Sequence, residues 1–171
     1  MKLSNKVAIV TGAASGMGKA IAELFAAEGA KVVASDLNLD GVAEVVRGIE
    51  AKGGTALAVK TNVASEEDVE RLFDETLKAY GTLDILINNA GIMDNFVPAA
   101  DVTDELWEKV FAVNMTGPMR TTRRALKIFT EKQSGVIVNV ASVGGLNGSR
   151  AGAAYTASKH ALIGFTKNVG F

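Results

Sequence analysis

The sequence contains no cysteine, and histidine is nearly absent, with His160 as its one representative. Without cysteine the chain can form neither disulfide bonds nor thiolate metal sites, and a lone histidine leaves few ligands for zinc. We therefore expect no bound metal ion.

An excess of charge and long hydrophobic runs are missing as well. The 18 lysine and arginine residues stand against 19 acidic residues, a formal net charge of -1, so no overall field attracts nucleic acid or an anionic membrane. The first apolar stretch, residues 7–11, is far too short for a signal peptide or a membrane span. We expect no nucleic-acid partner, no membrane partner and a cytoplasmic location.

The chain does contain short runs of valine and isoleucine that alternate with longer helical stretches. This alternation is typical of βαβ units and a parallel sheet, which is an α/β fold. With 171 residues, 48% of them hydrophobic, we expect one domain over residues 1–171. Strands are expected at residues 7–10, 31–35, 56–59, 85–87 and 136–140, and helices at 16–28, 39–52, 66–80 and 104–132.

Two local signals refine the expected helices. Ser65-Glu66-Glu67-Asp68 fits an N-terminal capping box, so the third helix should begin there. Gly117-Pro118 lies inside the fourth expected helix. An irregularity is expected there, because proline lacks the N–H that a regular helix needs. Either the helix breaks at this point, or it continues and leaves the backbone oxygen of Asn114 free to bind water.

The first strand leads into a glycine-rich loop, Thr11–Gly18, with the spacing G-x-x-x-G-x-G at Gly12, Gly16 and Gly18. Glycine lets the backbone turn tightly and lets a pyrophosphate approach the N-terminus of the following helix, where unpaired N–H groups favour an anion. The loop therefore predicts a dinucleotide site.

Asp36 ends the second strand, at about the distance expected for an acid that binds the ribose hydroxyls of adenosine. The same carboxylate would repel the 2′-phosphate of NADP. Leu37 follows it, and no arginine or lysine precedes Lys19 in the glycine loop. We expect NAD rather than NADP, and Asp36 could also cap the next helix.

Tyr155 and Lys159 are four residues apart, and Ser142 lies thirteen residues before Tyr155. On one helix face the two would be neighbours. A free phenol has a pKa of about 10, and a cation about 4 Å away would stabilise its phenolate by about 4 kcal/mol at an effective dielectric of ~20. This suits acid–base chemistry on an alcohol or carbonyl, although an ordinary amphipathic helix has the same spacing.

Together these motifs resemble those of the short-chain dehydrogenase/reductase family over the whole chain. The family's glycine motif corresponds to Gly12, Gly16 and Gly18, and its Asn-Asn-Ala-Gly stretch to Asn88 to Gly91. Its catalytic tetrad corresponds to Asn114, Ser142, Tyr155 and Lys159. The resemblance implies a Rossmann-like, doubly wound parallel sheet with helices on both faces, and hydride transfer between NAD(H) and a secondary alcohol or ketone.

The resemblance also implies a role for each site residue. Tyr155 would donate or accept the proton, Lys159 would favour the phenolate and hold the nicotinamide ribose, Ser142 would position the reacting oxygen, and Asn114 would hold a water that relays protons to Lys159. At the adenine pocket, where the family often has an acid before valine, the chain has Asn62-Val63, whose amide oxygen can still accept a hydrogen bond. The implied cofactor-binding residues are Gly12, Ser15, Gly16, Met17, Gly18, Asp36, Asn62, Val63, Asn89, Ala90, Gly91, Tyr155 and Lys159.

Family members normally continue beyond the point that corresponds to Phe171, with two more strands, a substrate-covering loop and a further helix. The resemblance therefore implies a domain whose C-terminal strands are missing, and residues 1–171 alone are not expected to form a well-behaved enzyme. It also implies a homo-oligomer, a dimer or tetramer, in the full-length form. The plausible substrate-lining residues are Ser142, Gly144, Asn147 and Met93 to Asn95.

Two other functions remain open. A basic stripe, Arg120, Arg123, Arg124 and Lys127, is either a solvated face or subunit contact, or a docking site for an acidic carrier that presents a 3-oxoacyl thioester for reduction by NADPH. Asp36 argues against the NADPH role. The other alternative is a non-catalytic dinucleotide-binding fragment, against which the intact Asn, Ser, Tyr and Lys set argues.

Overall fold

Five parallel strands form one sheet in the computed structural model, which describes residues 1–170. The sheet order is β3-β2-β1-β4-β5, so the chain reverses its direction of travel across the sheet between β1 and β4. Ligands of open α/β sheets bind at such a switch point, beyond the carboxyl ends of the strands. The strands are β1 Val7–Thr11, β2 Lys31–Asp36, β3 Thr55–Lys60, β4 Ile85–Asn88 and β5 Val136–Asn139.

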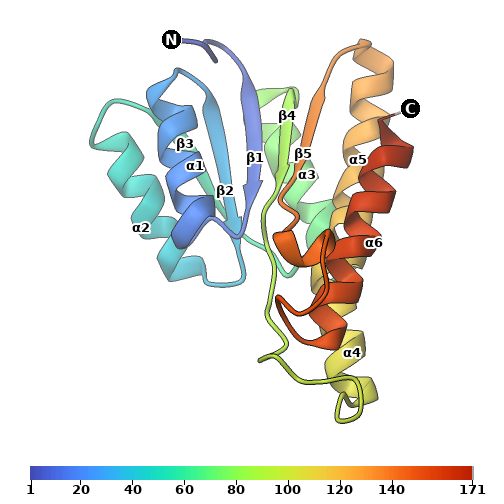
Figure 1. Ribbon diagram of the computed structural model, residues 1–171. Helices are drawn as coiled ribbons and strands as arrows, with labels where there is room; N and C mark the ends of the chain where they lie inside the picture. The colour runs from blue at the N-terminus through green and yellow to red at the C-terminus, as the bar shows by residue number, and fades with distance from the viewer. Residues whose placement is uncertain (171) are drawn as a thin grey trace.

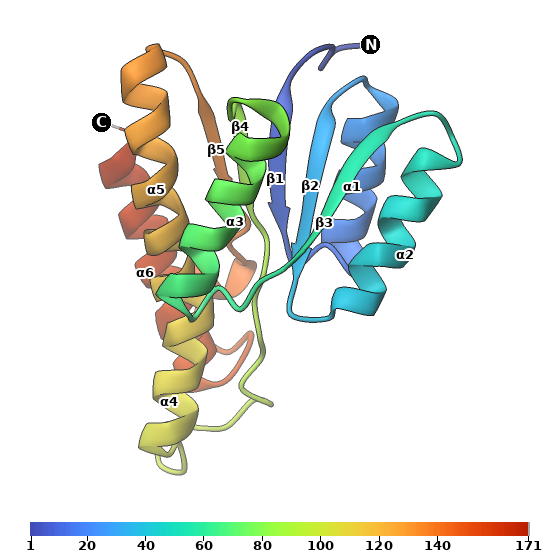
Figure 2. The same cartoon turned by 180° about the vertical axis from the view of Figure 1, so that it is seen from behind.

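Helices cover both faces of the sheet (Figures 1 and 2). On one face α1 and α2 pack on the sheet, and on the other α3 and α5 do so, as the doubly wound fold requires. The helices are α1 Gly16–Ala27, α2 Leu39–Glu50, α3 Glu66–Tyr80, α4 Asp104–Phe111, α5 Gly117–Lys132 and α6 Ala153–Val169. The α/β fold and the five expected strands are confirmed.

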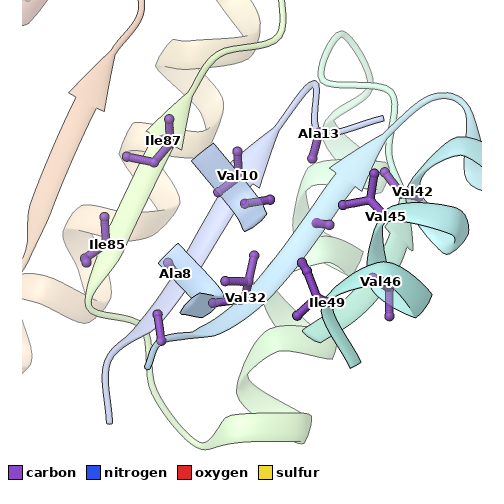
Figure 3. Packing of buried hydrophobic residues seen from close by; sticks show 14 residues of the cluster. Ala8, Val10, Ala13, Val32, Val42, Val45, Val46, Ile49, Ile85 and Ile87 are labelled. Atoms are coloured by element: carbon purple, nitrogen blue, oxygen red, sulfur yellow. The ribbon is translucent and has the colours of Figure 1, made fainter. Parts of the chain in front are cut away.

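Alternate residues of the central strands supply two hydrophobic cores. Ala8 and Val10 of β1 face α1 and α2, and Val7 and Ile9 face α3 and α5. Figure 3 shows the first core, in which Ala8 of β1 lies beside Val32 of β2, and Val42, Val45 and Ile49 of α2 belong to the same cluster. Strands that are buried on both faces read as continuous Val/Ile runs, which is why the sequence identified them.

The expected helix over residues 104–132 is neither broken nor regular. Between α4 and α5 the chain forms a π-helical segment, Ala112–Thr116, and remains helical. Pro118 cannot donate to the carbonyl of Asn114 four residues before it, so the regular hydrogen-bond ladder is interrupted there. Such widened turns are frequent at functional sites, and this one contains Asn114.

At the N-termini of α2 and α3, the structure corrects one sequence prediction and confirms another. Ser65 Oγ accepts a hydrogen bond from the N–H of Asp68 at 3.3 Å, which confirms the cap of α3. Asp36 does not cap α2, because Asn38 occupies that position and accepts from the N–H of Gly41 at 3.1 Å.

The basic stripe on α5 is largely neutralised within the chain. Arg123 pairs with Glu66 of α3 at 2.6 Å, and Arg124 pairs with Glu70 at 2.9 Å. The stripe therefore joins α5 to α3, a use that neither sequence interpretation included. An acidic carrier would have to displace these ion pairs.

Residues 1–170 contain neither a candidate membrane span nor a candidate metal site. None of the helices there combines the length and the hydropathy that a membrane crossing needs. Within the same residues, His, Asp and Glu side chains do not gather in threes in a way that could hold a metal ion.

Candidate active site

The glycine loop connects β1 to α1 in a conformation that only glycine adopts readily. Gly12 and Gly16 have positive φ angles of 67° and 54°, in the left-handed region where other residues are strained. A Cβ on Gly18 would collide with the carbonyl oxygen of Gly12. Asn89 braces this turn, because its side-chain amide donates to the carbonyl oxygens of Thr11 and Gly12 at 2.9 and 3.2 Å.

The N-terminus of α1 differs from those of α2, α3 and α4. A side chain caps each of those three helices, whereas Ser15 at the N-cap of α1 makes no side-chain hydrogen bond. Ser15, Gly16 and Met17 are exposed, and a Cβ on Gly16 would meet nothing within 4 Å. The first N–H groups of α1 therefore have space beside them for an anion.

A cavity of about 270 Å³ lies at the carboxyl ends of β1, β2 and β4. The Asp36 carboxylate borders it and accepts from the N–H groups of Ala14 and Asn38 at 3.1 and 2.9 Å. Ser35 Oγ is buried and has no hydrogen-bond partner among the described residues. The lining residues, none of them lysine or arginine, are Gly12, Ser35, Asp36, Leu37, Thr61, Asn62, Val63, Ala90, Gly91, Ile92 and Val113.

Asn62 and Val63 line this cavity, as the sequence suggests, but the amide oxygen of Asn62 is not entirely free. The Asn62 amide oxygen already accepts a hydrogen bond from the N–H of Ala64 at 3.0 Å. An amide oxygen has two lone pairs, so one remains for a ligand.

A second cavity, of about 160 Å³, adjoins the first at Gly91 and Ile92. Tyr155 and Lys159 of α6 line it together with Asn89 and Met17. The two cavities thus lie side by side beyond the carboxyl ends of β1 and β4, where Figure 1 shows the loops after β4 and β5 and the start of α6.

Lys159 is almost completely buried beside Tyr155, at 4% exposure. Its Nζ lies 5.7 Å from the centre of the Tyr155 ring and donates to the carbonyl oxygen of Val140 at 2.8 Å. Burial lowers the pKa of the Lys159 ammonium from its usual value of 10.5, because the charged form loses hydration.

Ser142 lies close to the ring of Tyr155. A Cβ placed on Gly144 would lie 3.4 Å from Ser142 Oγ and 3.5 Å from Cε1 of Tyr155. Tyr155 lines the second cavity, and Ser142 directly follows Ala141, which also lines it. A serine hydroxyl and a phenol so placed can bind and protonate one oxygen atom.

Asn114 is fully buried in the π-helical segment and holds the loop after β4. Its side-chain oxygen accepts from the N–H of Ile92 at 2.8 Å, and its nitrogen donates to the carbonyl of Ile92 at 3.0 Å and to Ser158 Oγ at 3.2 Å. The Asn114 side chain thus links the loop to α6. The sequence suggested a water-binding backbone oxygen and gave no sign of this second role.

The substrate-lining prediction is corrected at Asp94, and the two cavities are not lined by Asn95, Ser142, Gly144 or Asn147 either. Asp94 is fully buried, and its carboxylate binds backbone N–H groups of α6 instead of facing a cavity. Met93 does line the second cavity. No local sequence signal marks Asp94 or Ser158, because their partners lie far away along the chain.

Residues 6–171 match the sequence model of a family described as short chain dehydrogenase. The chain belongs to the short-chain dehydrogenase/reductase family. The resemblance that the motifs suggested is thereby confirmed, and the Rossmann-like fold with it.

Individual family members agree with this assignment. The chain is 43% identical over 170 residues to 3beta-hydroxysteroid dehydrogenase 2 of Eggerthella lenta, covering 99% of this chain and 65% of that protein. It is 41% identical over 169 residues to a 3-oxoacyl-[acyl-carrier-protein] reductase of a Synechocystis species, covering 98% of this chain and 68% of that one.

A solved family structure has the same fold. It is a short-chain dehydrogenase/reductase from Burkholderia phymatum in complex with NAD, with a TM-score of 0.94 and 34% identity, and the match covers 99% of this chain and 60% of that chain. The chain thus spans roughly two thirds of the length of the relatives it matches.

Proposed function

We propose that this protein is an NAD-dependent oxidoreductase that transfers hydride between the cofactor and a secondary alcohol or ketone. In this proposal residues 1–171 are a single dinucleotide-binding domain. One observation supports it most: Tyr155 and Lys159, with Ser142 close to the Tyr155 ring, line a cavity that adjoins the space next to Gly12 and Asp36.

The residues present fit a nicotinamide dinucleotide. The uncapped start of α1, with open space at Gly16, would hold the pyrophosphate, and Asp36 would bind the adenosine ribose. Ser35 Oγ, which has no hydrogen-bond partner among residues 1–170, offers a further polar contact. None of the described residues that line the cavity at Asp36 is a lysine or an arginine, which supports NAD over NADP.

In this proposal the proton chemistry belongs to Tyr155 and Lys159 of α6 and to Ser142 in the segment after β5. When bound, NAD would supply the acceptor for the hydride from the carbinol carbon. The Tyr155 phenolate oxygen would take the hydroxyl proton while Ser142 Oγ donates a hydrogen bond to the same substrate oxygen. The buried Lys159 ammonium would favour the phenolate, since a nearby cation stabilises an anion. A proton relay through water at the Asn114 backbone stays a prediction.

The substrate class that we propose is an apolar secondary alcohol. Met93 lines the second cavity and is 45% exposed, and Val143 and Leu146, one and four residues after Ser142, are 60% and 68% exposed. Exposed apolar side chains beside a polar reacting point favour a hydrophobic substrate. One relative is a 3β-hydroxysteroid dehydrogenase, which makes hydroxysteroids a reasonable first choice.

A substrate panel tests this function. The protein expressed from its complete gene is mixed with NAD and a series of secondary alcohols, from small linear ones to hydroxysteroids, and the reduced cofactor is followed by absorbance. We expect turnover with at least one apolar secondary alcohol. NAD binding with no turnover across the panel would favour the non-catalytic dinucleotide-binding function.

The alternative of a 3-oxoacyl thioester reductase has one supporting relative. Asp36 disfavours NADPH, and Arg123 and Arg124 are already paired with α3. The same assay run in reverse, with a 3-oxoacyl thioester and each reduced cofactor, separates the two functions.

We also propose that the full-length protein is a homo-oligomer, a dimer or tetramer, in the cytoplasm, as family membership suggests. A groove of about 640 Å³ between α5 and α6, whose lining includes Met119, Leu126, Phe165 and Val169, would be the contact. Sedimentation analysis of the protein would measure its assembly state.

A further inference from the structure

The carboxylate of Asp94 connects the loop after β4 to the start of α6. Its Oδ1 accepts from the N–H groups of Phe96 at 3.2 Å and Gly152 at 3.0 Å, and its Oδ2 accepts from the N–H of Tyr155 at 2.8 Å. Gly152 and Tyr155 lie 58 and 61 residues further along the chain. A buried carboxylate at 0% exposure is retained at a cost that these hydrogen bonds offset.

Asp94 takes the place that an N-cap side chain usually fills. Gly152 is the N-cap of α6 and has no side chain, and Tyr155 is the third helical residue, whose N–H a capping side chain would normally bind. A Cβ on Gly152 would lie only 2.5 Å from Asp94 Oδ2. The cap of α6 is therefore supplied by another element, and its negative charge also suits the helix dipole.

The backbone of Tyr155 is held on both sides. Its N–H donates to Asp94, and its carbonyl oxygen accepts from Ser158 Oγ at 2.8 Å. Ser158 in turn accepts from Asn114, which also binds the backbone of Ile92. The loop after β4, which lines both cavities, is thus hydrogen-bonded to the first turn of α6 directly through Asp94, and indirectly through Asn114 and Ser158.

We propose that Asp94 is a positioning residue for the proposed oxidoreductase: it fixes the first turn of α6 so that the Tyr155 phenol faces the cavity bordered by Gly91, Ile92 and Met93. The inference rests on the proposed function. Asp94 is not among the residues that line the two cavities described above and has no part in proton transfer in this proposal, so it acts through Tyr155. A displacement of about 1 Å at a reacting group can cost about 10²-fold in rate.

The first experiment compares Asp94→Asn with Asp84→Asn. Asp84 is another largely buried carboxylate that accepts a backbone N–H, that of Val7 at 2.9 Å, but it lies before β4 and contacts neither cavity nor α6. For Asp94→Asn we expect kcat to fall about 10-fold or more with the Kd of NAD unchanged, since Val140 holds Lys159 independently. Asp84→Asn should lose stability and keep its kcat. Equal kcat in the unmodified protein and Asp94→Asn would overturn the inference.

A second variant pair separates positioning from simple helix capping. Asp94→Ala removes the cap, and Gly152→Ser added to it supplies a local one, because the φ of −73° at Gly152 suits any residue and the carboxylate no longer fills the space. We expect the double variant to regain thermal stability while kcat stays low, since the loop remains detached from α6. Recovery of both would show that Asp94 is only a cap.

A spectroscopic measurement makes the test independent of turnover. Residues 1–171 contain Tyr80 and Tyr155, and in a protein labelled with ¹³C at the tyrosine Cζ their two signals are assigned by their loss in Tyr80→Phe and Tyr155→Phe. In the double variant we expect the Tyr155 signal to move and the Tyr80 signal on α3 to stay. An unmoved Tyr155 signal would contradict the positioning role even if the unmodified protein turned over no alcohol, whereas failure to bind NAD would contradict only the proposed function.

Discussion

Asp36 is the single residue on which the proposed cofactor preference depends. Its carboxylate is fixed by the N–H groups of Ala14 and Asn38, so it cannot turn away from a 2′-phosphate. Like charges in contact cost several kcal/mol, and each 1.4 kcal/mol is a tenfold change in affinity. We expect NAD to bind about 10-fold tighter than NADP or more, in a calorimetric titration.

Substitutions at Asp36 and Leu37 should change the preference for NAD over NADP. Asp36→Ala combined with Leu37→Arg should narrow or invert the preference, because the repulsion is removed and a phosphate partner is added. Asp40→Ala is the matched control, since Asp40 lies in the first turn of α2 and does not line the cavity. Tighter NADP binding by the unmodified protein would contradict the assignment.

Sequence reasoning succeeded for elements whose signals are local. The five strands were found because strands buried on both faces are uninterrupted Val/Ile runs, and α3 was found because Ser65 caps it. The π-helical segment was missed because it depends on contacts as well as on Pro118. Gly117 packs so closely on Val63 that a Cβ would lie 2.9 Å from Val63 Cγ2, and no local pattern reports this contact.

The tight packing at Gly117 predicts whether Gly117→Ala raises or lowers the free energy of unfolding. Helix propensity alone would make Gly117→Ala about 1 kcal/mol more stable. The clash with Val63 leads us to expect a loss of about 1–3 kcal/mol, measured by urea unfolding. Val63→Ala in the same protein should relieve part of the loss, and a stabilised Gly117→Ala would show that α5 is free to move.

At the scale of the whole molecule, Asp84 links segments at the end of the sheet opposite the site. Its carboxylate accepts from the N–H of Val7 at 2.9 Å and pairs with Lys132 at 2.7 Å. Burial raises the pKa of Asp84, but the hydrogen bonds from Lys132 and Val7 and the charges of Lys132 and Lys6 outweigh it, so the pKa lies below its usual 3.8.

The lowered pKa fixes the direction of the pH dependence. A carboxyl whose pKa is lower in the folded state stabilises the fold above its unfolded pKa, and this contribution is lost as the pH falls through the folded pKa. We expect Asp84→Asn to cost about 1–3 kcal/mol near neutral pH. In urea unfolding the difference from the unmodified protein should shrink as the pH falls from about 4. A difference that does not change with pH would contradict this origin.

The residues of the site could be predicted from the sequence, but the hydrogen bonds that hold them in place could not. Family motifs identified the glycine loop, Asp36 and the Asn, Ser, Tyr and Lys set. The hydrogen bonds that hold these groups in place, through Asp94, Ser158 and the side chain of Asn114, join segments far apart in sequence. They follow from the packing of α6 on the loop after β4, which composition and spacing do not encode locally.

The central claim is that Tyr155 transfers the proton while hydride passes to NAD, and isotope transfer tests it most directly. An apolar secondary alcohol with deuterium at its carbinol carbon is incubated with NAD and either the unmodified protein or Tyr155→Phe, and deuterium in the reduced cofactor is measured by mass spectrometry. We expect the unmodified protein to transfer deuterium. For Tyr155→Phe we expect the transfer rate to fall by about 10²-fold or more, with NAD binding retained. Equal rates of deuterium transfer in the two proteins would contradict the account.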